Sequence, residues 1–325
     1  MKSAKILITI LTLSILSVSG CGGGGGNGGG GSEGGDGNGN QCEQAEVSSG
    51  FTLSSDGWLQ KDGAPYLPLG LYSVPTNAVG DITSVDALAN VKGMAANTVA
   101  NPDWAVDTAT SEASLNMIGT KGLYGIIGVD ATGTAAIKSY ACAIKSHPAL
   151  MAYMLPDEAI STGISPSQLT ALYQAIKQAD PQGVVILVDD VANAPSVAKD
   201  AYDVFAYDEY PIGQESIQVF RSLFQTIVRN AAPKPVWSIL QAYSAGHTWY
   251  EPTPLELRNM AYLMLANGSK GMLTYEYNCT RVDPTDLYCL YDHTELYNAL
   301  QSLFTELQGF SSILTLPASS AKATA

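Results

Sequence analysis

Short runs of apolar residues recur along most of the chain, and helix-like segments lie between them. The predicted strands span residues 66–73, 94–101, 122–130, 149–156, 183–190, 203–210, 235–243 and 271–277. Continuous apolar runs of this length are typical of parallel strands that are buried on both faces. Eight such strands alternating with helices favour an α/β fold, a parallel (β/α)8 TIM barrel.

The segments between these strands carry helix signals. Predicted helices cover residues 84–92, 134–146, 165–179, 216–231, 254–267 and 294–308. Ser165 followed by Pro166 provides a side-chain cap and a proline in the first turn, and Pro254 stands at the start of another helix. A doubly wound open sheet is the alternative, but residues 71–75 lack the glycine fingerprint that follows the first strand in such sheets.

Three segments precede the predicted barrel, which covers residues 66–310 and is followed by a C-terminal tail at 311–325. Residues 1–20 combine two lysines with an apolar run too short to span a membrane, which is typical of a removed signal peptide. Residues 21–41 are almost entirely glycine and predict a flexible tether. Residues 42–65 contain two Asp-Gly pairs, which indicate small β-hairpins.

The N-terminal segment resembles the signal of a bacterial lipoprotein, because an apolar run and small residues lead to Cys21. The resemblance implies that Cys21 becomes the lipidated first residue of the mature protein. Since Gly22 rather than aspartate follows it, the resemblance also implies sorting to the outer membrane, on either its periplasmic or its surface face. We therefore expect a membrane-anchored protein of the bacterial cell envelope.

Composition excludes some classes of ligand. The chain has 16 basic and 30 acidic residues and a formal net charge of −14, so it lacks the basic footprint that nucleic acid requires. Its 3 histidines are scattered and no cysteine pair has the CxxC spacing. We therefore expect no metal site, and the sequence indicates no cofactor.

The cysteines of an exported protein can form disulfides. Cys279 and Cys289 are close in the sequence and form the favoured pair. Cys42 would then pair with Cys142 and fasten the start of the domain to the barrel.

Polar and aromatic residues follow the predicted strands, at the end where TIM barrels carry their active sites. Aromatic faces stack on the apolar patches of sugars, while carboxylates and amides bind hydroxyl groups. We therefore predict a carbohydrate site. Two alternatives are that single residues are merely satisfied turn residues, and that Asp157 and Glu158 cap the next helix. The predicted site residues are Tyr72, Asn101, Trp104, Asp157, Glu158, Asp208, Glu209, Tyr210, Gln241, Tyr243, Tyr275 and Glu276.

Five segments resemble the clan A glycoside hydrolases and related barrels, in the same order along the chain: residues 62–70, 147–158, 207–212, 234–243 and 268–277. The resemblance implies that Glu158 is the acid/base glutamate at the end of the fourth strand, with Asp157 where the clan usually has asparagine. It also implies a nucleophilic glutamate at the end of the seventh strand. This chain has Gln241 there, which cannot act as a carboxylate nucleophile.

Glycoside cleavage normally uses two carboxyl groups, one of which protonates the leaving oxygen. Glu276 ends the eighth strand, opposite the fourth, so we predict Glu158 as general acid and Glu276 as its partner, with Glu209 as a further candidate. We expect the carboxyl groups of opposite strands to lie roughly 6.5–9.5 Å apart, the separation found in glycosidases that invert the configuration of the anomeric carbon. We assign the remaining predicted site residues to substrate binding.

The resulting prediction is a cell-envelope hydrolase that cleaves O-glycosidic bonds of an oligo- or polysaccharide. The first alternative is a catalytically inactive barrel that binds carbohydrate, since the chain has Gln241 in place of the clan's nucleophile. A purely structural lipoprotein is the second alternative.

Overall fold

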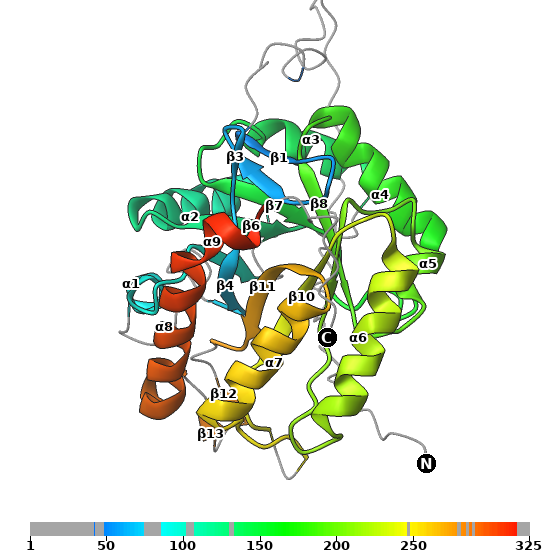
Figure 1. Cartoon of the computed structure of the whole chain (residues 1–325). Helices are drawn as coiled ribbons and strands as arrows, with labels where there is room; N and C mark the ends of the chain where they lie inside the picture. The colour runs from blue at the N-terminus through cyan, green and yellow to red at the C-terminus, as the bar shows by residue number, and fades with distance from the viewer. Residues whose placement is uncertain are drawn as a thin grey trace, which may run out of the picture. The chain divides into compact units, whose positions relative to one another are not determined.

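The computed structural model describes residues 42, 49–74, 86–101, 107–129, 133–245, 248–277, 281–283, 286–287 and 290–316, without the side chains of Asn101, 281–283 and 286–287. All of them belong to the compact unit that begins at Asn40. Within these residues, eight parallel strands close into a barrel in the order β10-β11-β4-β5-β6-β7-β8-β9 (Figure 1). The predicted (β/α)8 barrel is therefore confirmed.

Each barrel strand coincides with a predicted apolar run. The strands are β4 (Leu69–Tyr72), β5 (Thr98–Asn101), β6 (Tyr124–Gly128), β7 (Leu150–Met154), β8 (Val184–Asp189), β9 (Val204–Tyr207), β10 (Val236–Gln241) and β11 (Ser269–Tyr275). Two short strands, β12 (Arg281–Asp283) and β13 (Asp286–Leu287), pair with each other after the last barrel strand.

Helices follow the barrel strands along the chain. They are α1 (Ala87–Gly93), α2 (Thr108–Thr120), α3 (Thr134–Ile144), α4 (Pro166–Ala179), α5 (Ala194–Val197), α6 (Ile217–Ala231), α7 (Pro254–Ala266) and α8 (Thr294–Gly309), the last preceded by the 3-10 turn η2 (Leu290–Asp292). The short α9 (Ser311–Leu314) lies where the sequence predicts the tail, so that segment begins as a helix. No helix within the described residues has the length and hydrophobicity to cross a membrane.

Alternate residues of each strand serve two separate apolar layers. In β8, Val184, Ile186 and Val188 pack inside the barrel, whereas Val185 and Leu187 pack against the helices. Each of these side chains is nearly or completely buried. Burial of one such side chain contributes about 1.5–3 kcal/mol, so the two layers supply most of the stabilisation.

The helix starts follow the capping signals of the sequence. Ser165 and Gln168 form a reciprocal capping box at the start of α4, and Thr253 with Glu256 does the same for α7. These side chains satisfy amide groups that lack a partner in the first helical turn. The capping therefore fixes where each helix leaves the loop at the carboxyl end of the barrel.

A small antiparallel sheet precedes the barrel and consists of β1 (Phe51–Leu53), β2 (Leu59–Lys61) and β3 (Ala64–Pro65). Asp62 and Gly63 have φ angles of 52° and 79°, as a tight hairpin turn requires. Phe51 and Leu59 are buried in the same cluster as the inward-facing barrel side chains. The predicted hairpins are thus present, and they cover one end of the barrel interior.

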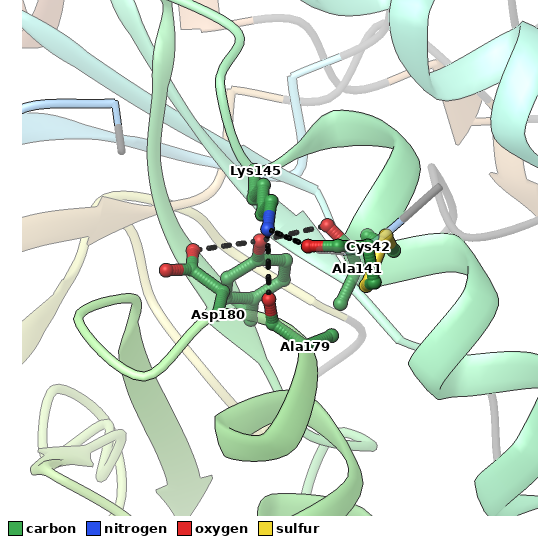
Figure 2. The surroundings of a disulfide bond; sticks show 7 residues. Cys42, Ala141, Lys145, Ala179 and Asp180 are labelled. Carbon is green, nitrogen blue, oxygen red and sulfur yellow. Dashed lines mark hydrogen bonds between the residues drawn. A yellow bond between two sulfur atoms is a disulfide. The ribbon is translucent and has the colours of Figure 1, made fainter. Parts of the chain in front are cut away.

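The start of this unit is held by a disulfide bond between Cys42 and Cys142 in α3, with a Cα–Cα distance of 5.3 Å. Figure 2 shows Lys145 beside this bridge, where its ammonium group donates to the carbonyl oxygens of Cys42, at 3.0 Å, and Ala179, at 3.3 Å. Because Lys145 is buried, these acceptors replace water around its charge. Cys21, Cys279 and Cys289 lie outside the described residues.

Candidate functional site

Asp157 and Glu158 follow β7, but they do not cap a helix. Helix α4 begins at Pro166 and has Ser165 as its N-cap, so the alternative explanation of the two acids does not hold. A turn lies in between, where the amide and the hydroxyl of Thr162 donate to the Glu158 carbonyl oxygen at 2.8 and 2.9 Å. The acids therefore occupy the loop at the carboxyl end of the fourth barrel strand.

Glu158 has a φ angle of 44°, in the left-handed region that non-glycine residues rarely adopt. Its side chain accepts a hydrogen bond from Ser161 Oγ at 3.3 Å. Such a conformation costs on the order of 1–3 kcal/mol and persists where surrounding contacts impose it, most often at functional sites. The backbone at Glu158 is thus consistent with a functional role of this side chain.

Asp189, at the end of β8, holds this turn in place. Its Oδ2 accepts the amides of Ile160, at 2.7 Å, and Ser161, at 3.4 Å, while Oδ1 accepts the amide of Val191 at 3.0 Å. The side chain is completely buried, and burial raises the pKa of Asp189 above its ordinary value. Asp189 therefore positions the loop that carries Glu158.

Tyr72, at the end of β4, donates a hydrogen bond of 2.6 Å to Oδ1 of Asp157. The pKa of Tyr72 lies well above its usual value of 10.0, first because the phenol is buried and then because of the negative charge of Asp157. The phenol keeps its proton and stabilises the ionised form of Asp157.

Asp208 follows β9 and continues its alternation. Val204 and Ala206 face the barrel interior, so Asp208 points inward as well. The residue is 5% exposed, and its Oδ1 atom is buried without a hydrogen-bond partner among the described residues. Burial raises its pKa well above 3.8, and the charges of Asp157 and Glu158 raise it further.

Glu209, the neighbour of Asp208, lies beside a residue of the helix-facing layer. Its Oε2 is 3.5 Å from the hydroxyl of Tyr207, whose ring packs against Phe220 and Phe224 of α6. Two adjacent acids at the end of one strand therefore differ in their surroundings.

Tyrosines from several strands form a wall beside these acids. Tyr210 stacks on Tyr275 with ring centroids 5.3 Å apart, and the ring of Tyr243 meets both edge-on, at 5.2 and 5.1 Å. Tyr72 lies 5.8 Å from Tyr275, and Trp249 lies 6.4 Å from Tyr243. The wall thus continues from the barrel interior to the loop after β10.

Glu276 joins the same group from the end of β11. Its side chain is 4% exposed, and its charge and its hydrogen bond raise the pKa of Tyr275, after the larger effect of burial. The pKa of Tyr243 is raised by burial and then by the charges of Glu276, Asp208 and Glu158. These acids, together with Glu209, therefore act electrostatically on one tyrosine.

Gln241, at the end of β10, is completely buried and engaged at both ends of its amide. Its Oε1 accepts the amide of Ile212 at 2.8 Å, and its Nε2 lies 3.2, 3.3 and 3.0 Å from the carbonyl oxygens of Ile212, Tyr243 and Tyr250. The side chain therefore fastens the loop after β9 to the loop after β10. Its contact with a ligand stays a prediction.

The structure brings together most of the predicted site residues. Tyr72, Tyr210, Tyr243 and Tyr275 lie in one aromatic wall beside the acids. Trp104 lies outside the described residues, and for Asn101 only the backbone, at the end of β5, is described. No group of three His, Cys, Asp or Glu side chains in the described part of the chain could hold a metal ion.

The set of predicted site residues did not include Asp189 and Trp249. The position of Asp189 at the end of a predicted strand is the sequence signal that could have identified it. Trp249 lies in the loop well after the end of the seventh strand, so a search for polar and aromatic residues at strand ends does not find it.

No known family profile matches the sequence, and no curated protein matches it. Solved structures share the fold. An endo-1,4-beta-mannanase from Eisenia fetida aligns with a TM-score of 0.57 and 12% identity over 78% of this chain and 94% of its own. A beta-galactosidase from the psychrophilic Marinomonas ef1 aligns with a TM-score of 0.59 and 9% identity over 77% and 61% of the two chains.

A calcium-binding mutant of beta-glucuronidase 2 from Bacteroides uniformis aligns with a TM-score of 0.57 and 12% identity over 78% of this chain. This chain spans 36%, 53% and 33% of three similar beta-glucuronidase structures. At these identities the likeness establishes the fold, a (β/α)8 barrel of the kind that glycoside hydrolases have.

Proposed function

We propose that this chain, which has the barrel fold of several glycoside hydrolases, hydrolyses O-glycosidic bonds of an oligo- or polysaccharide with a pair of carboxyl groups. One observation carries the proposal: acids and tyrosines from separate strands meet at the carboxyl end of a closed barrel. The charges of Glu158, Asp208 and Glu276 act on Tyr243, and the aromatic rings of the same wall are side chains of the kind on which sugar rings stack.

In the proposed reaction, Glu158 is the general acid. It donates its proton to the glycosidic oxygen as the bond between that oxygen and the anomeric carbon breaks. Glu276 accepts a proton from a water molecule, whose oxygen bonds to the anomeric carbon. Glu158 then takes up a proton from solvent and Glu276 releases one, which restores both groups.

The arrangement of the strands supports an inverting reaction. In the closed barrel, β7 and β11 are four strands apart, and thus opposite each other. Carboxyl groups about 6.5–9.5 Å apart leave room for the attacking water, whereas about 5–5.5 Å is typical of retaining enzymes. Proton NMR of the first product should therefore show the inverted anomer. Retention would contradict the role of Glu276 as a base.

The first test is release of reducing ends from plant, fungal and bacterial glycans. We expect turnover by the wild-type protein, and a loss of about 10²–10⁴-fold in Glu158→Gln and in Glu276→Gln. Glu112→Gln, in the exposed part of α2, is the matched control and should keep full activity. Full activity of both active-site variants would contradict the assignment.

A second candidate function is binding of carbohydrate without hydrolysis. It is favoured by Gln241, which stands where the resemblance places a nucleophilic glutamate and which is occupied by backbone contacts. Binding of a glycan without turnover on any glycan of the panel would support this candidate.

We also propose that Cys21 carries lipid and anchors the protein in the bacterial cell envelope, at the outer membrane. The support is the sequence of residues 1–22. Labelling of growing cells with a fatty acid should mark the wild-type protein and leave Cys21→Ser unlabelled. Equal labelling of both would contradict the anchor.

A further inference from the structure

Three lysines lie at the amino end of the barrel strands. Lys177 pairs with Asp203, just before β9, at 3.2 Å, and Lys234, just before β10, donates to the carbonyl oxygen of Tyr202 at 2.5 Å. Lys270, near the start of β11, lies 4.2 Å from the ring of Trp58. These lysines lie at the amino end of the strands together with Asp203, while the acids described above lie at the carboxyl end.

Among the acids at the carboxyl end of the strands, Asp208 is a buried group with incomplete contacts. Its Oδ1 atom is buried and lacks a hydrogen-bond partner in the described part of the chain. A buried polar atom without a partner is costly and rare in native proteins, so a ligand group that supplies a hydrogen-bond donor to it would be stabilised there. The alternation of β9 directs Asp208 toward the barrel interior, at the carboxyl end where the proposed function places the sugar.

We propose that the sugar bound against Asp208 carries an ammonium group, and that the Asp208 carboxylate receives it. The inference rests on the proposed function and specifies its substrate as a glycan that contains a free amino sugar. The ammonium group completes the contacts of Asp208 Oδ1. It also enters a site in which the charged groups that act most strongly on Asp208 are carboxylates. A neutral hydroxyl group completes the same hydrogen bond without this attraction, and a uronic acid is repelled.

The aromatic wall adds to this preference. Faces of tyrosine rings attract cations, and the attraction is stronger where water is excluded. Tyr210 and Tyr275 are stacked on each other next to Asp208, whose charge acts on Tyr210. An ammonium group at Asp208 therefore contacts a carboxylate and lies near aromatic rings.

Binding of the cation also changes the protonation of Asp208. Burial and neighbouring acids favour its neutral form in the free protein, so a proton leaves for solvent when the ammonium group binds. The titratable groups that interact with it are Asp157 and Glu158 after β7, Asp189 and Asp190 at the end of β8, and the tyrosines Tyr72, Tyr207, Tyr210 and Tyr243.

Calorimetric titration of the wild-type protein with fully deacetylated chitosan oligomers and with cello-oligosaccharides of equal length tests the inference. We expect the amino-sugar oligomers to bind about 10–100-fold more tightly, because charge-assisted hydrogen bonds are the stronger ones. Titrations in buffers of different ionisation enthalpy should show release of a proton. Chromatography checks for cleavage of the oligomers, and cleavage of the amino-sugar oligomers alone supports the inference as well.

Asp208→Asn should lose both the preference and the proton release. Asp56→Asn, which makes the same change of charge in an exposed turn, should lose neither. Equal affinity of the wild-type protein for both oligomers, no binding of amino-sugar oligomers, or an unchanged preference in Asp208→Asn would overturn the inference. The wild-type comparison remains decisive if the variant does not fold.

The outcomes also separate this inference from the proposed function. Hydrolysis of a neutral glycan without any preference for amino sugars overturns the inference alone. Preferential binding of amino-sugar oligomers without turnover of any glycan overturns the proposed hydrolase activity and leaves the inference about the amino sugar standing.

Discussion

The phenolic oxygen of Tyr72 donates a 2.6 Å hydrogen bond to Oδ1 of Asp157 and so joins the ends of β4 and β7. Two other strands, β5 and β6, lie between them in the barrel order, so the bond reaches across its mouth. Asp157 is thereby fixed next to Glu158, whose backbone is held by Thr162. The position of the proposed general acid thus depends on a contact made from the first barrel strand.

Tyr72→Phe should reduce kcat/KM by about 10–100-fold, because a hydrogen bond to a charged group contributes about 1.5–3 kcal/mol. The measurement is steady-state hydrolysis of the glycan that the screen identifies. Tyr66→Phe is the matched control, since it removes a bond of 3.2 Å to the Asn97 carbonyl oxygen before the start of β5. Equal losses of activity in both variants would indicate a general loss of stability instead.

Asp208→Asn should make the free energy of unfolding less sensitive to pH. The pKa of Asp208 in the folded protein is raised above 3.8, so its contribution to stability is complete below that pH and is lost as pH rises through the folded pKa. The variant should therefore gain stability relative to wild type as the pH rises from about 4 through the folded pKa of Asp208. Urea unfolding across this range measures the difference, and a constant difference would refute the raised pKa.

Gln241→Glu should not create a working nucleophile. The change removes the Nε2 donor to the carbonyl oxygens of Ile212 and Tyr250 and buries a negative charge beside them. We expect a loss of about 3 kcal/mol or more in the free energy of unfolding, measured with urea. Gln218→Glu, in the exposed first turn of α6, should be nearly neutral. A stable and more active Gln241→Glu protein would contradict the supporting role.

Gly271→Ala should destabilise the barrel interior. A Cβ atom at this position would lie 2.6 Å from the indole of Trp237 and 2.7 Å from Pro68. Overpacking of this kind costs about 1–3 kcal/mol, which thermal unfolding can measure. Gly309→Ala, at the end of α8 with nothing within 4 Å, should be neutral or slightly stabilising. Similar melting temperatures for wild type and Gly271→Ala would show that the interior can relax.

The barrel could be predicted from the sequence because its strands are apolar on both faces and stand out as continuous runs. The sequence does not predict helix α2, since its large buried residues are Leu115 and Ile118 within a segment that contains several Thr and Ser residues. Helix α9 is a single turn with no buried residue, so the sequence has no hydrophobic periodicity that would predict it.

The site could be predicted as a set of strand ends but not in its details. Asp208 and Glu209 are equivalent in a sequence pattern, and only the alternation of β9 and the contact with Tyr207 separate them. The side-chain amide of Gln241 forms hydrogen bonds with two loops, and these loops come close to each other only through long-range packing. Asp189 acts through backbone amides, which no side-chain motif reveals.

The most direct measurement of the central claim compares Glu158→Gln and Glu276→Gln on two forms of the same substrate, the natural glycan and an aryl glycoside with a good leaving group. A leaving group that needs no proton should restore most of the activity of Glu158→Gln, while the natural glycan shows a loss of about 10²–10⁴-fold. Glu276→Gln should be impaired on both. Equal activity of Glu158→Gln and wild type on the natural glycan, or equal losses of Glu158→Gln on both substrates, would contradict its role as general acid.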